Sequence, residues 1–209
     1  MTRRLVQLVA SCLVLGLGVS LLLDARLGSD GYSTLLSGLT KATGASFLLV
    51  SLAVGLPLIG IAWLRGRPPG IGTLAQAVLV GLTVNTAWPL MPSPESLPWR
   101  GVELVAAFVV LAVGVAGYLA VDLGAGPTEV IAQAFDPPVP FRWGYTTVQA
   151  TGMVVGWLCG ADVGVGTVMV VVGLGYAVSR LIPPLTPAAT SAAPPPATPP
   201  PALGRAGTP

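Results

Sequence analysis

The sequence has no histidine and few charged residues. Asp, Glu, Lys and Arg make up only 9% of the 209 residues, whereas 53% are hydrophobic. Soluble globular domains usually carry about 25% charged residues, so this chain has too few to cover a surface that faces water. The composition therefore predicts a protein whose main partner is the lipid bilayer.

The same scarcities exclude several function classes. Without histidine, the chain cannot use Ser-His-Asp or Cys-His catalysis, nor His ligands for a metal or haem. Its cysteines, Cys12 and Cys159, lie in apolar runs, which is typical of small buried side chains rather than of a disulfide framework. The net charge of +2 and the lack of a basic stripe indicate no nucleic-acid partner. We expect no enzyme activity, no metal and no cofactor.

Uncharged apolar stretches recur along the chain at the length of membrane spans. A bilayer core of about 30 Å requires roughly 20 apolar residues in a helix. The first stretch is too long for the apolar region of a signal peptide and no A-x-A cleavage site follows it, so we interpret it as an uncleaved span. The six predicted spans are residues 5–23, 45–64, 71–91, 102–121, 144–160 and 163–179. We therefore predict an all-α polytopic membrane protein.

The basic residues predict the orientation of these spans. Cytoplasmic loops carry an excess of Lys and Arg, so the side with more of them should face the cytoplasm, together with both termini. One side has Arg3, Arg4, Arg65, Arg67, Arg142, Arg180 and Arg205, and the other has Arg26, Lys41 and Arg100. Tryptophans lie near the predicted span ends, where their rings favour the headgroup region. They are Trp63, Trp88, Trp99, Trp143 and Trp157.

The composition changes abruptly after Ile182. Residues 183–209 hold ten of the 21 prolines, seven alanines and a single charged side chain. Such a segment has no helical period and cannot bury a core. We predict a disordered cytoplasmic tail that is partly polyproline II.

Short motifs recur in the two halves of the chain, residues 1–92 and 93–182. Leu-Gly at 27–28 matches Leu-Gly at 123–124 at an offset of 96, and Gly-x-Gly-Thr at 70–73 matches 164–167 at an offset of 94. Each half has three predicted spans, an odd number, so two halves of one fold would be inverted relative to each other in the membrane. Chance matches among many glycines are the alternative explanation.

A glycine break and a short helix are predicted after the first span of each half, at residues 28–39 and 124–131. In transporters, the N-termini of paired half-helices bind solutes with their free N–H groups. The candidate solute-binding residues in these segments are Gly28, Asp30, Gly124, Gly126, Pro127 and Glu129. A carboxylate in the first turn of a helix is also favoured by the helix dipole, which explains Glu129 without a solute. Alternatively, the short helices lie flat on the membrane surface.

Gln76 and Gln149 are further candidate solute-binding residues, because polar side chains are costly inside a bilayer. Each lies near threonines of the same predicted span, Gln76 near Thr73 and Thr83, and Gln149 near Thr147. Such stripes line a solute pathway in some proteins and form interhelical hydrogen bonds of about 0.6 kcal/mol in others. Both interpretations stay open.

Gly152, Gly156 and Gly160 repeat at every fourth residue and predict a close packing face. That face packs either within the same bundle or against a second copy, which would make a homodimer.

Several of these motifs resemble the bacterial YczE/YyaS/YitT family of membrane proteins. They are Leu-Gly-x-Gly-Pro at 123–127, Gly-x-Gly-Thr opening the third and sixth spans, and Trp-Leu-x-Gly at 157–160. The similarity covers residues 13–182 and implies a polytopic protein of the bacterial inner membrane, with no catalytic residue to carry over. Positions that are charged in the family pattern are neutral here, which argues against ion coupling through charged pairs. They are Asn85, Thr128, Tyr145 and Gln149.

The inverted duplication and the paired breaks favour a transporter or permease for a small solute. The alternative is a non-transporting scaffold or accessory factor that acts through helix–helix contacts, for which the glycine face at 152–160 would serve.

Overall fold

The computed structural model describes residues 2–186, which form eight α-helices, one 3-10 helix and no strand. The prediction of an all-α fold is therefore confirmed. The elements are α1 (Thr2–Asp24), α2 (Gly31–Thr43), α3 (Phe47–Leu64), α4 (Ile71–Ala87), η1 (Trp88–Leu90), α5 (Leu97–Ala120), α6 (Pro127–Ala134), α7 (Phe141–Leu158) and α8 (Val165–Leu185).

Each predicted span coincides with a long helix, and five helices are apolar and long enough to cross a membrane. These are α1, α3, α4 with η1, α5 and α8. The remaining long helix, α7, has 18 residues but begins with the more polar sequence FRWGYTTVQ. The chain is therefore a membrane protein with several helices that are able to span a bilayer.

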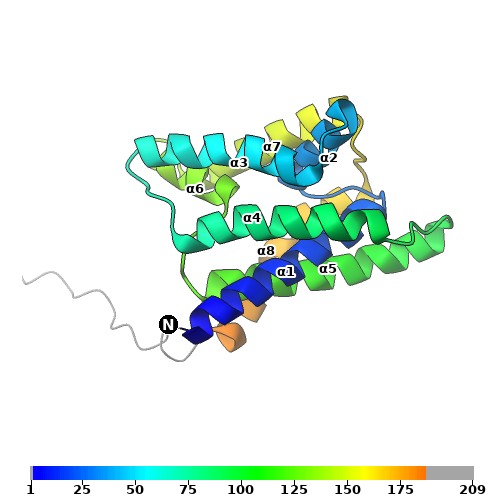
Figure 1. The fold of residues 1–209 in the computed structure, drawn as a ribbon, viewed down its shortest axis with the longest axis horizontal. Helices are drawn as coiled ribbons and strands as arrows, with labels where there is room; N and C mark the ends of the chain where they lie inside the picture. Colours follow the sequence, from blue (N-terminus) through cyan, green and yellow to red (C-terminus); the bar gives the residue numbers. More distant parts are fainter. Residues whose placement is uncertain (1, 187–209) are drawn as a thin grey trace, which may run out of the picture.

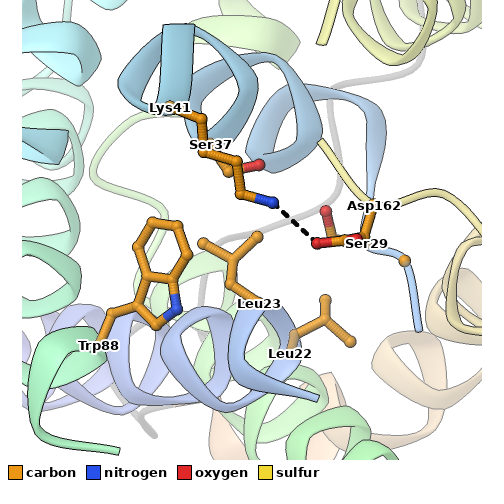
Figure 2. A pocket seen from close by; sticks show the side chains of 8 residues that line it. Leu22, Leu23, Ser29, Ser37, Lys41, Trp88 and Asp162 are labelled. Carbon is orange, nitrogen blue, oxygen red and sulfur yellow. Dashed lines mark hydrogen bonds and ion pairs between the residues drawn. The ribbon is translucent and has the colours of Figure 1, made fainter. Parts of the chain in front are cut away.

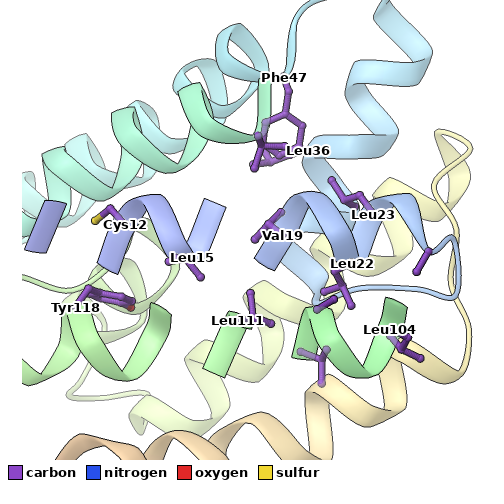
Figure 3. Close-up of a cluster of buried hydrophobic side chains, with 14 of the residues drawn as sticks. Cys12, Leu15, Val19, Leu22, Leu23, Leu36, Phe47, Leu104, Leu111 and Tyr118 are labelled. Carbon is purple, nitrogen blue, oxygen red and sulfur yellow. The ribbon is translucent and has the colours of Figure 1, made fainter. Parts of the chain in front are cut away.

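The helices form two layers (Figure 1). One layer contains α1, α4, α5 and α8, with α1 packed on both α4 and α5. The other contains α2, α3, α6 and α7, and contacts between α3 and α4 join the two layers. Most of the apolar core lies along α1 and α5, with Leu15, Leu22 and Leu111 almost fully buried (Figure 3).

Helices α1 and α5 cross through two glycines in a reciprocal arrangement. A Cβ added to Gly18 would lie 2.7 Å from the backbone N of Leu111, and one added to Gly114 would lie 2.5 Å from that of Leu15. Both distances are too short for any side chain, so only glycine lets the backbones come this close.

The loops after α1 and α5 make equivalent hydrogen bonds, each with a helix of the other half of the chain. The N–H of Gly72 donates to the carbonyl of Leu123 at 2.8 Å, and the N–H of Gly166 donates to the carbonyl of Leu27 at 2.7 Å. The Gly-x-Gly-Thr motif of each half thus binds the Leu-Gly motif of the other. The first turns of α4 and α8 would otherwise leave these N–H groups without a partner.

Basic residues gather at the two ends of the bundle seen in Figure 1. At the end that holds the N-terminus, the Arg4 guanidinium donates to the carbonyl of Val121 at 3.1 Å, and Arg65 lies over the ring of Phe135 at 4.0 Å. At the other end, Arg100 donates to the carbonyl of Arg26 at 2.6 Å. The exposed tryptophans Trp63, Trp99, Trp143 and Trp157 all lie within a few residues of helix ends.

Helix α8 ends later than the sequence predicted. It continues through Pro183 and Pro184 to Leu185, so the first three residues assigned to the predicted tail are helical. The Gln7 side chain of α1 donates to the carbonyl of Leu185 at 2.7 Å, which satisfies one free carbonyl of this last turn. The rest of the predicted tail, residues 187–209, lies outside the described residues.

Candidate functional site

The two short helices begin close to each other, next to α3. Helix α2 starts at Gly31, and α6 starts at Pro127, whose ring suits the first position of a helix. A Cβ on Gly55 of α3 would lie 3.1 Å from the Tyr32 hydroxyl and 3.6 Å from Cγ of Pro127. Side chains from the first turns of α2 and α6, the Tyr32 hydroxyl and the Pro127 ring, therefore lie against the same residue of α3.

Glu129 lies in the first turn of α6 and is partly buried. Its Oε2 accepts a hydrogen bond from the Thr128 hydroxyl at 3.0 Å, and its Oε1 accepts a longer one from the Tyr118 hydroxyl at 3.4 Å. The salt bridge found among residues 2–186 joins Lys41 to Asp162, so no cation pairs with Glu129 there. Desolvation by burial raises the pKa of Glu129 above its ordinary value, and the charge of Asp30 adds to this effect.

Gln76 of α4 reaches the same place. A Cβ on Gly126 would collide with Oε1 of Gln76 and would lie 2.5 Å from Oε2 of Glu129. Glycine at 126 therefore lets an amide and a carboxyl group approach the start of α6 together. Oε1 of Gln76 is buried and has no hydrogen-bond partner within the described part of the chain. A buried acceptor without a donor is costly, which marks a place where a water or a donor group of a solute would be stabilised.

Gln149 of α7 connects this place to the start of α2. Its Oε1 accepts from the N–H of Tyr32 at 2.8 Å, and its Nε2 donates to the Tyr145 hydroxyl at 2.8 Å. Tyr145 in turn lies within electrostatic range of Glu129 and Asp30. Asp30 caps α2, because its Oδ2 accepts from the N–H of Ser33 at 3.0 Å.

Residues from five helices and one cap thus form a set that we call the central polar cluster. It consists of Asp30, Tyr32, Gln76, Tyr118, Glu129, Tyr145 and Gln149. Hydroxyl, amide and carboxyl groups dominate it, so it is able to hold a polar solute or a proton. Residues 2–186 contain no group of three His, Cys, Asp or Glu side chains able to hold a metal ion.

The structure brings six of the eight predicted solute-binding residues to this cluster or its edge: Asp30, Gln76, Gly126, Pro127, Glu129 and Gln149. Gly28 and Gly124 lie elsewhere and have positive φ angles of 102° and 134°. A Cβ on Gly28 would meet the start of α8 near Thr167, and one on Gly124 would meet the start of α4 near Thr73. Both glycines therefore have a packing role.

Of the three predicted packing glycines, two lie against another helix and one does not. A Cβ on Gly152 would lie 2.7 Å from the carbonyl O of Gly31, and one on Gly156 would lie 2.7 Å from the N of Leu35. Both glycines therefore pack α7 against α2 within the chain. Gly160 lies beyond the end of α7 with φ +90°, and nothing is within 4 Å of a Cβ there.

Sequence reasoning missed the three tyrosines of the cluster, Tyr32, Tyr118 and Tyr145. Tyr118 was the easiest to find, because it is the one polar side chain in the second half of the apolar run at 102–121. A tyrosine hydroxyl inside a membrane span requires a hydrogen-bond partner. The sequence gives no indication that this partner is Glu129, which lies in a different helix.

Comparison with known proteins agrees with this architecture. A family model described as a family of unknown function, DUF6198, matches residues 2–183. The "Uncharacterized membrane protein YczE" of Bacillus subtilis (strain 168) is 24% identical over 178 residues, which cover 83% of each chain. An "Uncharacterized protein" of Haemophilus influenzae is 29% identical over 175 residues, which cover 79% of this chain and 77% of the relative. No solved structure matches. The chain belongs to the DUF6198 family and is a YczE-like membrane protein.

Proposed function

We propose that this protein is a transporter or permease that moves a small solute across the bacterial inner membrane, with both termini in the cytoplasm. The observation that carries the proposal is the meeting of the α2 and α6 N-termini at a polar cluster inside an apolar bundle. Half-helices that begin at such a cluster direct a positive partial charge towards a bound solute. At α2 the N–H groups of Tyr32 and Ser33 are already bonded to Gln149 and Asp30, so a solute there would meet these side chains.

The reciprocal contacts support the second part of the proposal, two inverted repeats of three spans each, residues 1–92 and 93–182. The pairs Gly18–Leu111 and Gly114–Leu15 exchange equivalent positions, as do Gly72–Leu123 and Gly166–Leu27. Arg26 and Asp122 also occupy equivalent positions, and both have a positive φ angle, of 52° and 49°. Inverted repeats of this kind move against each other in alternating-access transporters.

The burial of α2 argues against short helices that lie flat on the membrane surface. Thr34, Leu36 and Ser37 are all at most 3% exposed, and α2 packs on both α7 and α3. A helix at the interface would have one face free for headgroups and water along its length. We place the scaffold alternative second, because the glycines on which it depended, Gly152 and Gly156, are covered by α2.

Labelling by a membrane-impermeant thiol reagent tests the proposal. Glu129→Cys is made in a Cys12→Ala, Cys159→Ala background, and right-side-out and inside-out vesicles are compared. We expect slow labelling from at least one side, because a solute pathway contains water. The matched control is Ala132→Cys on the same helix, since Ala132 is 2% exposed and packs against α7. Protection of Glu129→Cys from both sides, as in this control, contradicts the proposal.

Reconstitution in liposomes completes the test. A panel of radiolabelled small solutes is screened with the wild-type protein, and the solute found is tested with Glu129→Gln. We expect uptake by the wild type and at least a tenfold loss in the variant, since a hydrogen bond to a charged group contributes about 1.5–3 kcal/mol. Equal uptake by both proteins would place the solute pathway away from the central polar cluster.

A further inference from the structure

A second polar site lies at the end of the bundle away from the N-terminus. A cavity of about 630 Å³ opens where α1, α2 and α4 end and α3 begins. This volume is within the range of about 300–1,000 Å³ that is usual for small-molecule sites. Its lining has charged groups of both signs and an apolar wall, so the cavity differs in chemistry from the central polar cluster, which has no basic residue.

One of the charges in the cavity, that of Asp24, is already occupied by structural contacts. Asp24 is buried, and its carboxylate accepts from the hydroxyl of Ser93 at 2.6 Å and from the N–H of Ser93 at 2.9 Å. These bonds hold the segment between η1 and α5 against α1. Asp24 is therefore not available to a ligand. Arg26, at the end of α1, is exposed and adds a second cation to the lining.

Lys41 and Asp162 are the pair of opposite charges that a ligand can reach. Lys41 Nζ lies 2.8 Å from Oδ2 of Asp162, and the two side chains are 39% and 43% exposed. Because exposed ion pairs contribute little net stability, their partners are exchanged at low cost. Lys41 also donates to the carbonyl of Gly160 at 3.2 Å, but a ligand with only one charge would leave either Lys41 or Asp162 without its ionic partner. A zwitterion would replace both partners at once.

The rest of the wall favours an apolar part on the same ligand. Leu23, Val84, Met91 and Trp88 line the cavity, and Trp88 is held by an edge-to-face contact with Phe47 at 6.1 Å between ring centroids. An apolar side chain on the ligand would remove the accessible part of this wall, at Trp88 and Met91, from water.

The ion pair also lies between the cavity and the interior of the bundle. A narrow pocket below it shares Leu23, Lys41, Trp88 and Asp162 with the cavity and continues to Ser29 and Ser37 (Figure 2). Ser29 bonds to the Thr34 hydroxyl at 2.8 Å and precedes Asp30 of the central polar cluster. The narrow pocket has room for about 10 Å³ only, so a solute in the cavity stops at the ion pair in this conformation.

We infer that the cavity binds a small zwitterionic solute of the apolar amino-acid class, with its carboxylate on Lys41 and its ammonium group on Asp162. The solute's onward movement rests on the proposed transport function, whereas its binding does not. The inference therefore names the class of solute and its first contact with the protein.

Binding is measured on the purified full-length protein in detergent by titration calorimetry and by the shift in melting temperature. The probes are L-leucine and two analogues of matched shape that each lack one charge, 4-methylpentanoate and 3-methylbutylamine. Glycine and L-phenylalanine test the size of the apolar part. We expect L-leucine to bind and each analogue to bind at least about tenfold more weakly, since each loses a charged hydrogen bond.

Variants locate the binding at the ion pair. Lys41→Gln and Asp162→Asn should lose L-leucine binding, and Lys41→Arg, which retains the cation, should keep it. Glu95→Gln and Arg67→Gln are matched controls, since both residues are exposed and neither lines the cavity. The melting temperature of each variant without ligand shows that it is folded.

Each result decides the inference. It is wrong if none of the three amino acids binds, if the analogues bind as well as L-leucine, or if Lys41→Gln and Asp162→Asn both retain binding. Binding without uptake into liposomes supports the inference and contradicts the proposed transport function. Uptake of a different solute by a protein that binds no amino acid supports transport and overturns the inference.

Discussion

The backbone N–H of Gly166 donates a hydrogen bond of 2.7 Å to the carbonyl of Leu27, and the loop that contains Leu27 leads directly into α2. The start of α8 thereby fixes the position of the start of α2. The hydrogen bond of 2.8 Å from the N–H of Gly72 to the carbonyl of Leu123 fixes the start of α6 in the same way. Two motifs that look like packing glycines in the sequence thus position the helices that carry Asp30 and Glu129.

Gly28→Ala should destabilise the fold far more than Gly44→Ala. Both glycines have positive φ angles, 102° and 69°, but a Cβ at Gly44 has nothing within 4 Å, whereas one at Gly28 would lie 2.6 Å from the N of Gly164. We expect a cost of about 1 kcal/mol for Gly44→Ala from backbone strain alone. For Gly28→Ala we expect at least about 2 kcal/mol, because overpacking adds to that strain. Thermal unfolding in detergent measures both, and equal losses would contradict the contact with α8.

Asp30→Ala should destabilise the start of α2, and Asp30→Asn should not. The carboxylate of Asp30 accepts from the N–H of Ser33 at 3.0 Å, and an asparagine side chain can accept the same bond. Loss of an N-cap costs about 0.5–2 kcal/mol, and asparagine is as good a cap as aspartate. The two melting temperatures separate the capping role from the charge. If Asp30→Asn melts normally but loses solute uptake, the charge itself acts in the central polar cluster.

Glu129 should make the protein less stable as the pH rises. Its folded pKa is raised above the ordinary value of 4.5, so above that pH the unfolded chain loses a proton that the folded chain keeps. The folded state is then favoured at low pH, and this contribution is lost as the pH rises through the folded pKa. As the pH rises through this range, the melting temperature should fall more steeply for the wild type than for Glu129→Gln. The difference between the two slopes corresponds to at most one bound proton. Glu95→Gln, an exposed carboxyl, should retain the wild-type slope.

Helix α7 should cross the membrane although its first half is polar. If it crosses, Arg142 at its start and Val163 after its end face opposite sides of the membrane. Both side chains are exposed, so Arg142→Cys and Val163→Cys are suitable for impermeant thiol labelling in the Cys12→Ala, Cys159→Ala background. We expect labelling from opposite sides. Labelling of both from the same side would leave five spans and would contradict the proposed inverted repeats.

Much of the helical organisation was predictable because it depends on local properties. The apolar stretches predicted the six long helices, with ends that shift by up to six residues, since apolar length sets the extent of a membrane helix. Breaks at Gly28 and Gly124 and the proline at 127 predicted the two short helices. The end of α8 was missed, because the hydrogen bond from Gln7 to Leu185 depends on how α1 and α8 both pack on α5.

The sequence by itself determined that the chain enters a membrane, where its helices form and which residues are polar at depth, because all three follow from composition and spacing. The tertiary structure decided which of these residues meet. Gln76 and Glu129 join at Gly126, while Gly152 and Gly156 face α2 rather than a second copy. The tyrosine hydroxyls of α5 and α7 reach Glu129 and Gln149, and the cavity at Lys41 and Asp162 forms between distant segments. These pairings depend on how separate helices pack, which no local pattern specifies.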